Sequence, residues 1–253
     1  MTGAVLLAQF LFRASFGLAV GMAVTSPRQV TSGYYRNHLY VLLGLNVLAA
    51  LVAASAPDRL VLWPALAAAI LSYLGAASWL YEKAVPGLLL LVAVAVVTLW
   101  GAYLAAAPPS GPWPAPELWW LNAPSSGLVL GLTLAAMFLG HWYLNTPTMA
   151  LEPLLRLIKL MGAAIVFRAV ICAAGLTLEL RLLGTPATSQ WLFLLLRWLS
   201  GIVGALLLTV MAYKTMQIPN TQSATGILYV AVIATFLGEL VSLLLSTTLA
   251  APV

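Results

Sequence analysis

Four ionisable residues lie inside long apolar runs of this sequence: Arg13, Arg168, Arg197 and Glu239. Charged side chains are costly inside a bilayer, so they usually mark a ligand site or an ion pair there. Three guanidinium groups and one carboxylate leave an excess of positive charge. A lipid phosphate, a carboxylate or a quinone oxygen would complement it. In the structural alternative, Glu239 pairs with one arginine while the others bond to helix carbonyls or reach water.

The two histidines form a second group of candidates. His141 and Tyr143 end one apolar run, and His38 lies near the start of another. Two imidazoles at one depth can ligate a haem b. The alternatives are a quinone-binding or proton-handling role for His141, or structural roles for both histidines. Tyr143 is either part of the same ligand site or one of the aromatic residues that collect at membrane interfaces.

Composition places these residues in a membrane protein. Hydrophobic residues make up 63% of the chain and charged residues 7%, so one soluble core could not bury the apolar surface. Runs long enough to cross about 30 Å of hydrocarbon occur eight times. We expect an all-α, polytopic membrane helix bundle that forms a single domain over residues 1–253, with helices at roughly 4–24, 37–56, 61–81, 87–107, 124–145, 154–176, 190–213 and 225–248.

Two of the connecting segments carry a recognisable pattern. The longest one, 108–127, is rich in proline and contains three tryptophans, which predicts a short segment lying at the interface. Residues 219–226, PNTQSATG, predict cap and turn chemistry before the last helix. The alternative for this second segment is a polar loop that folds back toward His141.

Basic residues indicate the orientation of the chain. The connections after the first, third, fifth and seventh helices, with the adjoining helix ends, hold six basic residues, whereas the opposite side holds two. The six are Arg28, Arg36, Lys83, Arg156, Lys159 and Lys214, and the two are Arg59 and Arg181. The positive-inside rule therefore predicts a multi-pass protein of the inner (plasma) membrane with both termini outside.

This topology places the four intramembrane charges in one layer, at or just to the outer side of the helix centres. Small and polar residues share their helical faces, which predicts that the charges point into the bundle. We predict a buried ion pair between Glu239 and Arg168 or Arg197, because an unpaired charge is costly in hydrocarbon. His38 and His141 are predicted to approach each other on the inner side.

Several functions are excluded by the absence of their motifs. The sequence has no Gly-rich phosphate loop, no HExxH or CxxC motif and no GxSxG nucleophile elbow. Its single cysteine, Cys172, forms no intrachain disulfide. The basic residues are few and lie mostly at helix ends, so we expect no nucleic-acid partner.

Two classes of function remain. The first expectation is a membrane subunit of an electron-transfer complex, which anchors other subunits and binds a quinone or haem b. Such a subunit would be non-catalytic or quinone-binding rather than a self-contained enzyme. The alternative is a transporter or lipid-handling protein, which binds an anion at the arginine layer. Membrane lipids are expected partners in both cases.

Overall fold

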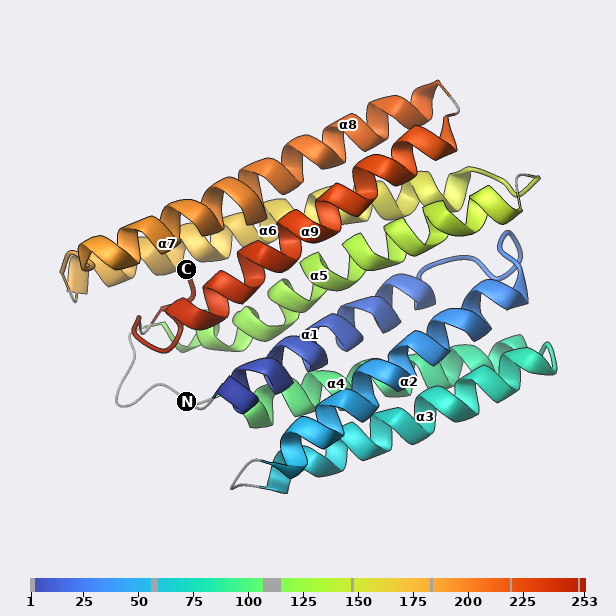
Figure 1. Cartoon of the computed structure of the whole chain (residues 1–253), viewed down its shortest axis with the longest axis horizontal. Helices are drawn as coiled ribbons and strands as arrows, with labels where there is room; N and C mark the ends of the chain where they lie inside the picture. The colour runs from blue at the N-terminus through green and yellow to red at the C-terminus, as the bar shows by residue number, and fades with distance from the viewer. Residues whose placement is uncertain are drawn as a thin grey trace.

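The chain is a bundle of membrane-spanning helices (Figure 1). The computed structural model describes residues 3–55, 59–106, 115–146, 148–182, 184–218, 220–249 and 251–253. Within these ranges there is no strand, and eight helical spans are long and apolar enough to cross a membrane. The predicted all-α bundle of eight spans is therefore confirmed.

Seven of the spans are single helices, one of them preceded by a 3₁₀ turn, and one is interrupted. The single helices are α1 (Gly3–Ala23), α2 (Ser32–Ala54), α3 (Leu62–Leu80, after the 3₁₀ turn Arg59–Val61), α4 (Ala84–Ala105), α5 (Pro116–Asn145), α6 (Glu152–Leu182) and α9 (Thr221–Leu245). The interrupted span begins as α7 (Thr188–Trp198), passes through a π-helical turn (Leu199–Gly204) and continues as α8 (Ala205–Gln217).

The helices form two four-helix halves with the same order of neighbours. In the first half α1 packs on α2 and α4, and α3 lies between α2 and α4. In the second half α5 packs on α6 and α9, and the α7–α8 span lies between α6 and α9. The halves meet chiefly along α1 and α5, which run in the same direction at the centre of the bundle (Figure 1). This arrangement was not evident from the sequence.

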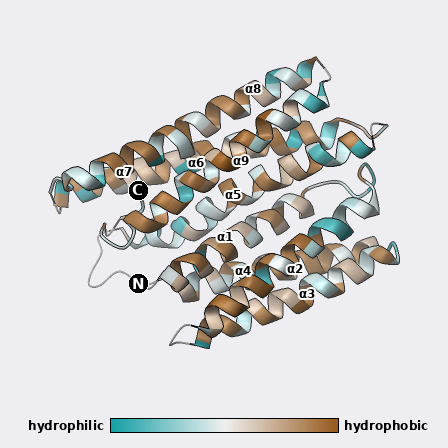
Figure 2. Cartoon of the chain, in the orientation of Figure 1, coloured by the Kyte–Doolittle hydropathy of each residue, from teal (hydrophilic) through white to brown (hydrophobic). Residues whose placement is uncertain are grey.

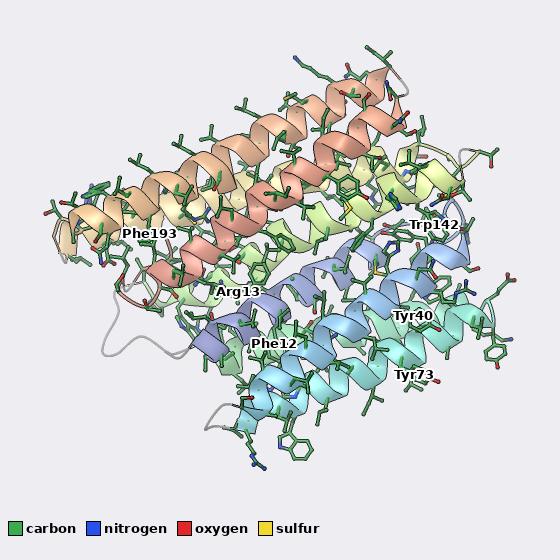
Figure 3. The ribbon with its side chains drawn as sticks, viewed as in Figure 1. Phe12, Arg13, Tyr40, Tyr73, Trp142 and Phe193 are labelled. Carbon is green, nitrogen blue, oxygen red and sulfur yellow. The ribbon has the colours of Figure 1, made fainter. Side chains whose placement is uncertain are left out.

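Burial agrees with the central position of α1 and α5. In their most apolar windows 78% and 83% of the residues are buried, compared with 33% to 44% in the other spans. Hydrophobic colour covers the middle of the helices, and hydrophilic residues gather at their ends (Figure 2). Tyr40, Tyr73 and Phe193 project outward, whereas Phe12 and Arg13 point inward (Figure 3). The outer surface thus suits lipid, and the buried polar groups lie near α1 and α5.

Both termini lie at the same end of the bundle (Figure 1). This agrees with the predicted even number of spans. We call this end the outer end, following the basic-residue distribution; its location outside the cell stays a prediction.

The structure differs from the predicted connection 108–127 at residues 116–123, which precede the predicted span 124–145 and are helical. Pro116 begins α5, which continues through Pro124 to Asn145. The interfacial location of this segment stays a prediction. Pro116 suits the first turn of a helix, and Pro124 removes the donor that would bond to the Trp120 carbonyl. The Tyr103 hydroxyl of α4 donates to that carbonyl at 2.6 Å instead. Because the freed carbonyl is satisfied, α5 can begin about two turns earlier than predicted.

Other helix ends also differ from the predicted ones. The second span begins at Ser32 rather than near residue 37, and the sixth extends to Leu182 rather than 176. At the start of α9 the Asn220 side chain accepts a hydrogen bond from the Ser223 amide at 2.9 Å, which confirms the predicted cap. Residues 56, 107–114 and 219, which belong to predicted segments, lie outside the described residues.

Candidate functional site

A buried ion pair joins α6 to α9. Arg168 donates from Nε to Glu239 Oε1 at 3.2 Å and from Nη2 to Glu239 Oε2 at 3.1 Å. The same guanidinium donates to Asn122 Oδ1 at 2.8 Å and to the hydroxyls of Ser125 and Ser242, both at 3.2 Å. Each nitrogen of Arg168 therefore has an acceptor within the protein. The protein itself therefore supplies the hydrogen-bond acceptors that a ligand would offer to this guanidinium.

A second guanidinium shares the same carboxylate. Arg197 of α7 donates from Nη2 to Glu239 Oε1 at 3.1 Å and from Nε to the main-chain oxygen of Val253 at 2.9 Å. Its Nη2 also lies 3.1 Å from the Cys172 Sγ. The predicted pairing of Glu239 with Arg168 or Arg197 is confirmed, and it involves both arginines.

Two glycines allow α9 to approach the interrupted span closely enough for this contact. A Cβ atom on Gly201 would lie 2.7 Å from the Gly238 Cα, a distance that side chains do not tolerate. Gly238 directly precedes Glu239, and Gly201 follows Arg197 by about one helical turn. The backbone contact therefore brings the charged groups within hydrogen-bonding distance, as small residues do at helix crossings in membranes.

Arg13 of α1 is buried without an acidic partner. Arg13 is 3% exposed. Among the described residues its guanidinium makes one hydrogen bond, from Nη2 to Gln9 Oε1 at 3.4 Å, and its Nε has no partner. Glu239 and Arg168 are near enough to interact with Arg13 electrostatically, but Glu239 forms its ion pairs with the other two arginines. Arg13 thus retains hydrogen-bond donors and a charge that the described residues do not match.

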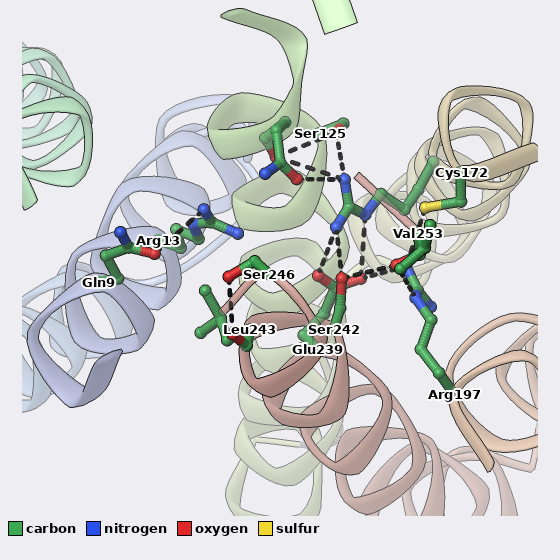
Figure 4. Close-up of polar contacts among 12 residues, drawn as sticks. Gln9, Arg13, Ser125, Cys172, Arg197, Glu239, Ser242, Leu243, Ser246 and Val253 are labelled. Carbon is green, nitrogen blue, oxygen red and sulfur yellow. Dashed lines mark hydrogen bonds and ion pairs between the residues drawn. The ribbon is translucent and has the colours of Figure 1, made fainter. Parts of the chain in front are cut away.

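The close approach of α1 and α5 determines where Arg13 points. The backbones of Gly17 on α1 and of Gly127 and Gly131 on α5 leave no room for a Cβ atom between them. Gly17 lies one helical turn beyond Arg13, so this contact holds Arg13 against the outer half of α5. Figure 4 shows the Arg13 side chain directed from α1 toward α5 and α9. Gln9 is held in turn by a 2.7 Å bond from its Nε2 to the Ala105 carbonyl.

The predicted layer of four charges is thus divided into two parts. Arg168, Arg197 and Glu239 form one network of ion pairs, and Arg13 lies beside that network without joining it (Figure 4). Three arginines and one glutamate leave two formal positive charges in this region. The predicted role of these residues in ligand binding stays a prediction, and the geometry favours Arg13 for it.

The histidine candidates face different helices. His38 Nδ1 lies 2.6 Å from the Tyr34 carbonyl, and its ring packs against Phe138 of α5 with a centroid separation of 4.6 Å. His141 is exposed, and its Nδ1 lies 3.1 Å from the hydroxyl of Tyr229 on α9. The two imidazoles therefore make separate contacts, yet they lie near enough to each other to interact electrostatically. Their joint ligation of haem b stays a prediction.

Tyr143 has a structural contact. Its side chain is 1% exposed, and its hydroxyl donates to the Ala150 carbonyl, which lies in the connection between α5 and α6. This bond fixes the connection to the end of α5. The predicted ligand-binding role of Tyr143 would require its hydroxyl to leave that carbonyl.

Sequence reasoning did not identify several residues of the site. Gln9 precedes Arg13 by four residues, a spacing that places the two side chains on one helical face and could have indicated their contact. Asn122 lies in the predicted connection 108–127, and Ser125 lies at the start of the predicted span 124–145, where the sequence does not mark it as a partner of Arg168. The acceptor contributed by Val253 depends on how the last residues fold back against α7 and α9, for which the sequence carries no signal.

No protein-family model matches the chain, and comparisons with curated proteins and with solved structures find no match either. The functional interpretation therefore rests on the residues and their geometry.

Proposed function

We propose that this chain is a multi-pass protein of the plasma (inner) membrane that binds an anionic ligand at Arg13, for transport or for lipid handling. A single observation carries the proposal. Arg13 is buried between the two helical halves with one long hydrogen bond and no acidic partner among the described residues, whereas its neighbours Arg168 and Arg197 share Glu239.

The energetic argument concerns the cost of an unpaired guanidinium. On insertion scales a central arginine costs on the order of 3 kcal/mol before compensation. The bond from Arg13 to Gln9 is 3.4 Å long and has a neutral acceptor, so it offsets little of this cost. A bound carboxylate or phosphate would accept charge-assisted hydrogen bonds from the free donors. Arg13 is therefore the arginine that gains most from an external anion.

The position of Arg13 supports transport or lipid handling. Many transporters consist of two halves, and their substrates bind where the halves meet. Arg13 lies on α1, next to α5, which are the helices through which the halves of this protein meet. The π-helical turn at Leu199–Gly204 is a second irregular feature of the outer half, and such turns often occur at functional sites.

The electron-transfer subunit is the second candidate, and a different pair of residues favours it. His141 and Tyr229 are exposed near the inner end of the bundle and contact each other at 3.1 Å. Imidazole and phenol groups both exchange hydrogen bonds with quinone carbonyls and can carry protons. An absorbance spectrum of the protein purified with its lipids and partners, followed by quinone extraction, tests this candidate. Absence of both quinone and haem bands would exclude it.

Thermal unfolding with added anions tests the proposal for Arg13. We expect decanoate, glycerol phosphate or inorganic phosphate to raise the midpoint of unfolding of the wild-type protein, because a ligand that binds only the folded state stabilises it. Arg13→Gln should abolish the rise. The matched control is Arg59→Gln, which removes an exposed arginine at the same end of the bundle. An equal rise in the Arg13→Gln and wild-type proteins would refute the site.

A further inference from the structure

A groove runs along the lipid-facing surface between α6 and α8, away from Arg13. Its volume is about 790 Å³. Gly162 and Ala163 form its floor on α6, and Phe167 and Tyr213 stand among the larger residues that line it. Small residues beside large ones produce the hollow.

The lining of the groove is almost wholly apolar. Thr209 directs its hydroxyl to the Ala205 carbonyl at 2.7 Å, so its methyl group faces Gly162. Val166 and Val170 are 51% and 63% exposed along the groove. A chain of methylene groups is therefore the chemistry that this surface accommodates.

The inner end of the groove is basic. Lys159 lies there with its Nζ 5.7 Å from the centre of the Tyr213 ring, across from α6 to α8. Arg156 and Lys214 are exposed on the same ends of these helices. The nearest acid along α6, Glu152, accepts a hydrogen bond from Gln29 at 3.0 Å. Three cations and one engaged carboxylate leave the mouth of the groove positively charged.

The length of the groove matches one leaflet of a bilayer. From Lys159 to Val170 the helix rises by about 16 Å, which is about half of the roughly 30 Å hydrocarbon core. The apolar lining thus spans one leaflet, and the basic end lies at its interface with water. The basic-residue distribution places this end on the cytoplasmic side, where anionic lipids attract basic clusters.

We infer that the α6–α8 groove is a binding site for an anionic phospholipid of the inner leaflet. An acyl chain lies along Ala163, Val166 and Val170, and Lys159 contacts the phosphate with support from the neighbouring basic residues. This site is separate from the one proposed at Arg13. It requires neither transport nor electron transfer.

Native mass spectrometry can test the site directly. The protein is reconstituted in vesicles of equimolar phosphatidylglycerol and phosphatidylcholine with identical chains, then released in mild detergent. We expect the wild-type protein to retain phosphatidylglycerol in preference to phosphatidylcholine. Lys159→Gln should weaken this binding about fivefold, the effect of one basic residue near a membrane surface. Ala163→Leu should remove the bound lipid by filling the groove from an exposed position.

The matched control is Lys83→Gln, which removes an exposed lysine at the same end of the bundle, outside the groove. It should leave the retained lipid unchanged, and circular-dichroism spectra of all variants should match that of the wild type. Equal retention of the two lipids, or unchanged phosphatidylglycerol in Ala163→Leu, would overturn the inference. Copurification of an apolar polypeptide that Ala163→Leu releases would overturn it too, because the groove would then bind a partner helix.

Discussion

Arg168 holds Glu239 through two parallel hydrogen bonds, from Nε to Oε1 at 3.2 Å and from Nη2 to Oε2 at 3.1 Å. This is the bidentate geometry in which a guanidinium binds a carboxylate most strongly. Oε1 also accepts from Arg197 at 3.1 Å, so one carboxylate connects α6, α7 and α9. Glu239 is thereby committed to ion pairs within the bundle, and Arg13 is left without an acidic partner among the described residues.

The network predicts a large contribution of Glu239 to the stability of the protein. Glu239→Gln should lower the free energy of unfolding by about 3–5 kcal/mol, because it leaves two buried guanidinium groups without their carboxylate. Thermal or denaturant unfolding of the purified protein measures the loss. Glu117→Gln, which neutralises an exposed glutamate at the start of α5, should change stability by less than about 0.5 kcal/mol. Equal effects of the two substitutions would contradict the structural role of Glu239.

The crossing of α9 with the interrupted span predicts different effects at two glycines of one helix. A Cβ atom on Gly238 would come within 2.8 Å of the Gly201 amide nitrogen, whereas one on Gly226 would meet nothing within 4 Å. Gly238→Ala should destabilise the protein by roughly 1–3 kcal/mol through overpacking. Gly226→Ala should be neutral or stabilise by up to about 1 kcal/mol, because alanine is the better helix former. Unfolding measurements that show no difference would disprove the close contact.

The bond from Tyr103 to the Trp120 carbonyl can be tested together with Pro124. Tyr103→Phe keeps the ring and removes the donor, and we expect a loss of about 1 kcal/mol with faster hydrogen exchange in the first turns of α5. Pro124→Ala restores the helical N–H that bonds to the same carbonyl. In the Pro124→Ala background Tyr103→Phe should therefore cost less, as a double-mutant cycle measures. Tyr73→Phe, on the outward face of α3, serves as the control.

Much of the charge network could be predicted from the sequence. The lengths of the apolar runs predicted the number of spans. The shared membrane depth of the charges predicted the partners of Glu239, because a charge in hydrocarbon needs an oppositely charged neighbour at the same depth. Depth could not decide between Arg168 and Arg197. That choice depends on which helices touch, and here the Gly201–Gly238 contact lets both arginines reach the carboxylate.

The missed parts of the site have physical causes. The prolines and tryptophans before residue 124 are typical of a loop, and the hydroxyl of Tyr103 on another helix satisfies the Trp120 carbonyl in this first part of α5. Asn122 therefore could not be recognised as a partner of Arg168. The histidines illustrate a second limit, because similar depth does not fix the direction of a side chain. His38 packs against α5, the helix that carries His141, whereas His141 contacts Tyr229 on α9.

The orientation of the bundle is a further prediction. Reporter fusions at the two ends of the chain should give the same result, because the described spans are even in number and both termini lie at one end of the bundle. The basic-residue distribution predicts that this shared side is outside. Fusions that report opposite sides would contradict the number of spans. A cytoplasmic result for both would reverse the orientation and the leaflet assigned to the α6–α8 groove.

Gln9 is predicted to position Arg13 rather than to bind the ligand itself. Its side chain connects the Arg13 Nη2 to the Ala105 carbonyl on α4. Gln9→Leu should weaken the effect of anions on thermal unfolding while keeping the folded yield, and Gln9→Glu should abolish the effect because a carboxylate beside Arg13 replaces the ligand. An unchanged response to anions in Gln9→Glu would show that Arg13 does not bind them.

The most direct test of the central claim is mass spectrometry of small molecules extracted from purified wild-type, Arg13→Gln and Arg59→Gln proteins. Folding is checked by unfolding curves of each sample. The account predicts an anion, bearing a carboxylate or a phosphate, that accompanies the wild-type and Arg59→Gln proteins and is absent from Arg13→Gln. Retention of the same anion by folded Arg13→Gln, or no anion enriched in the wild-type protein relative to Arg13→Gln, would contradict it.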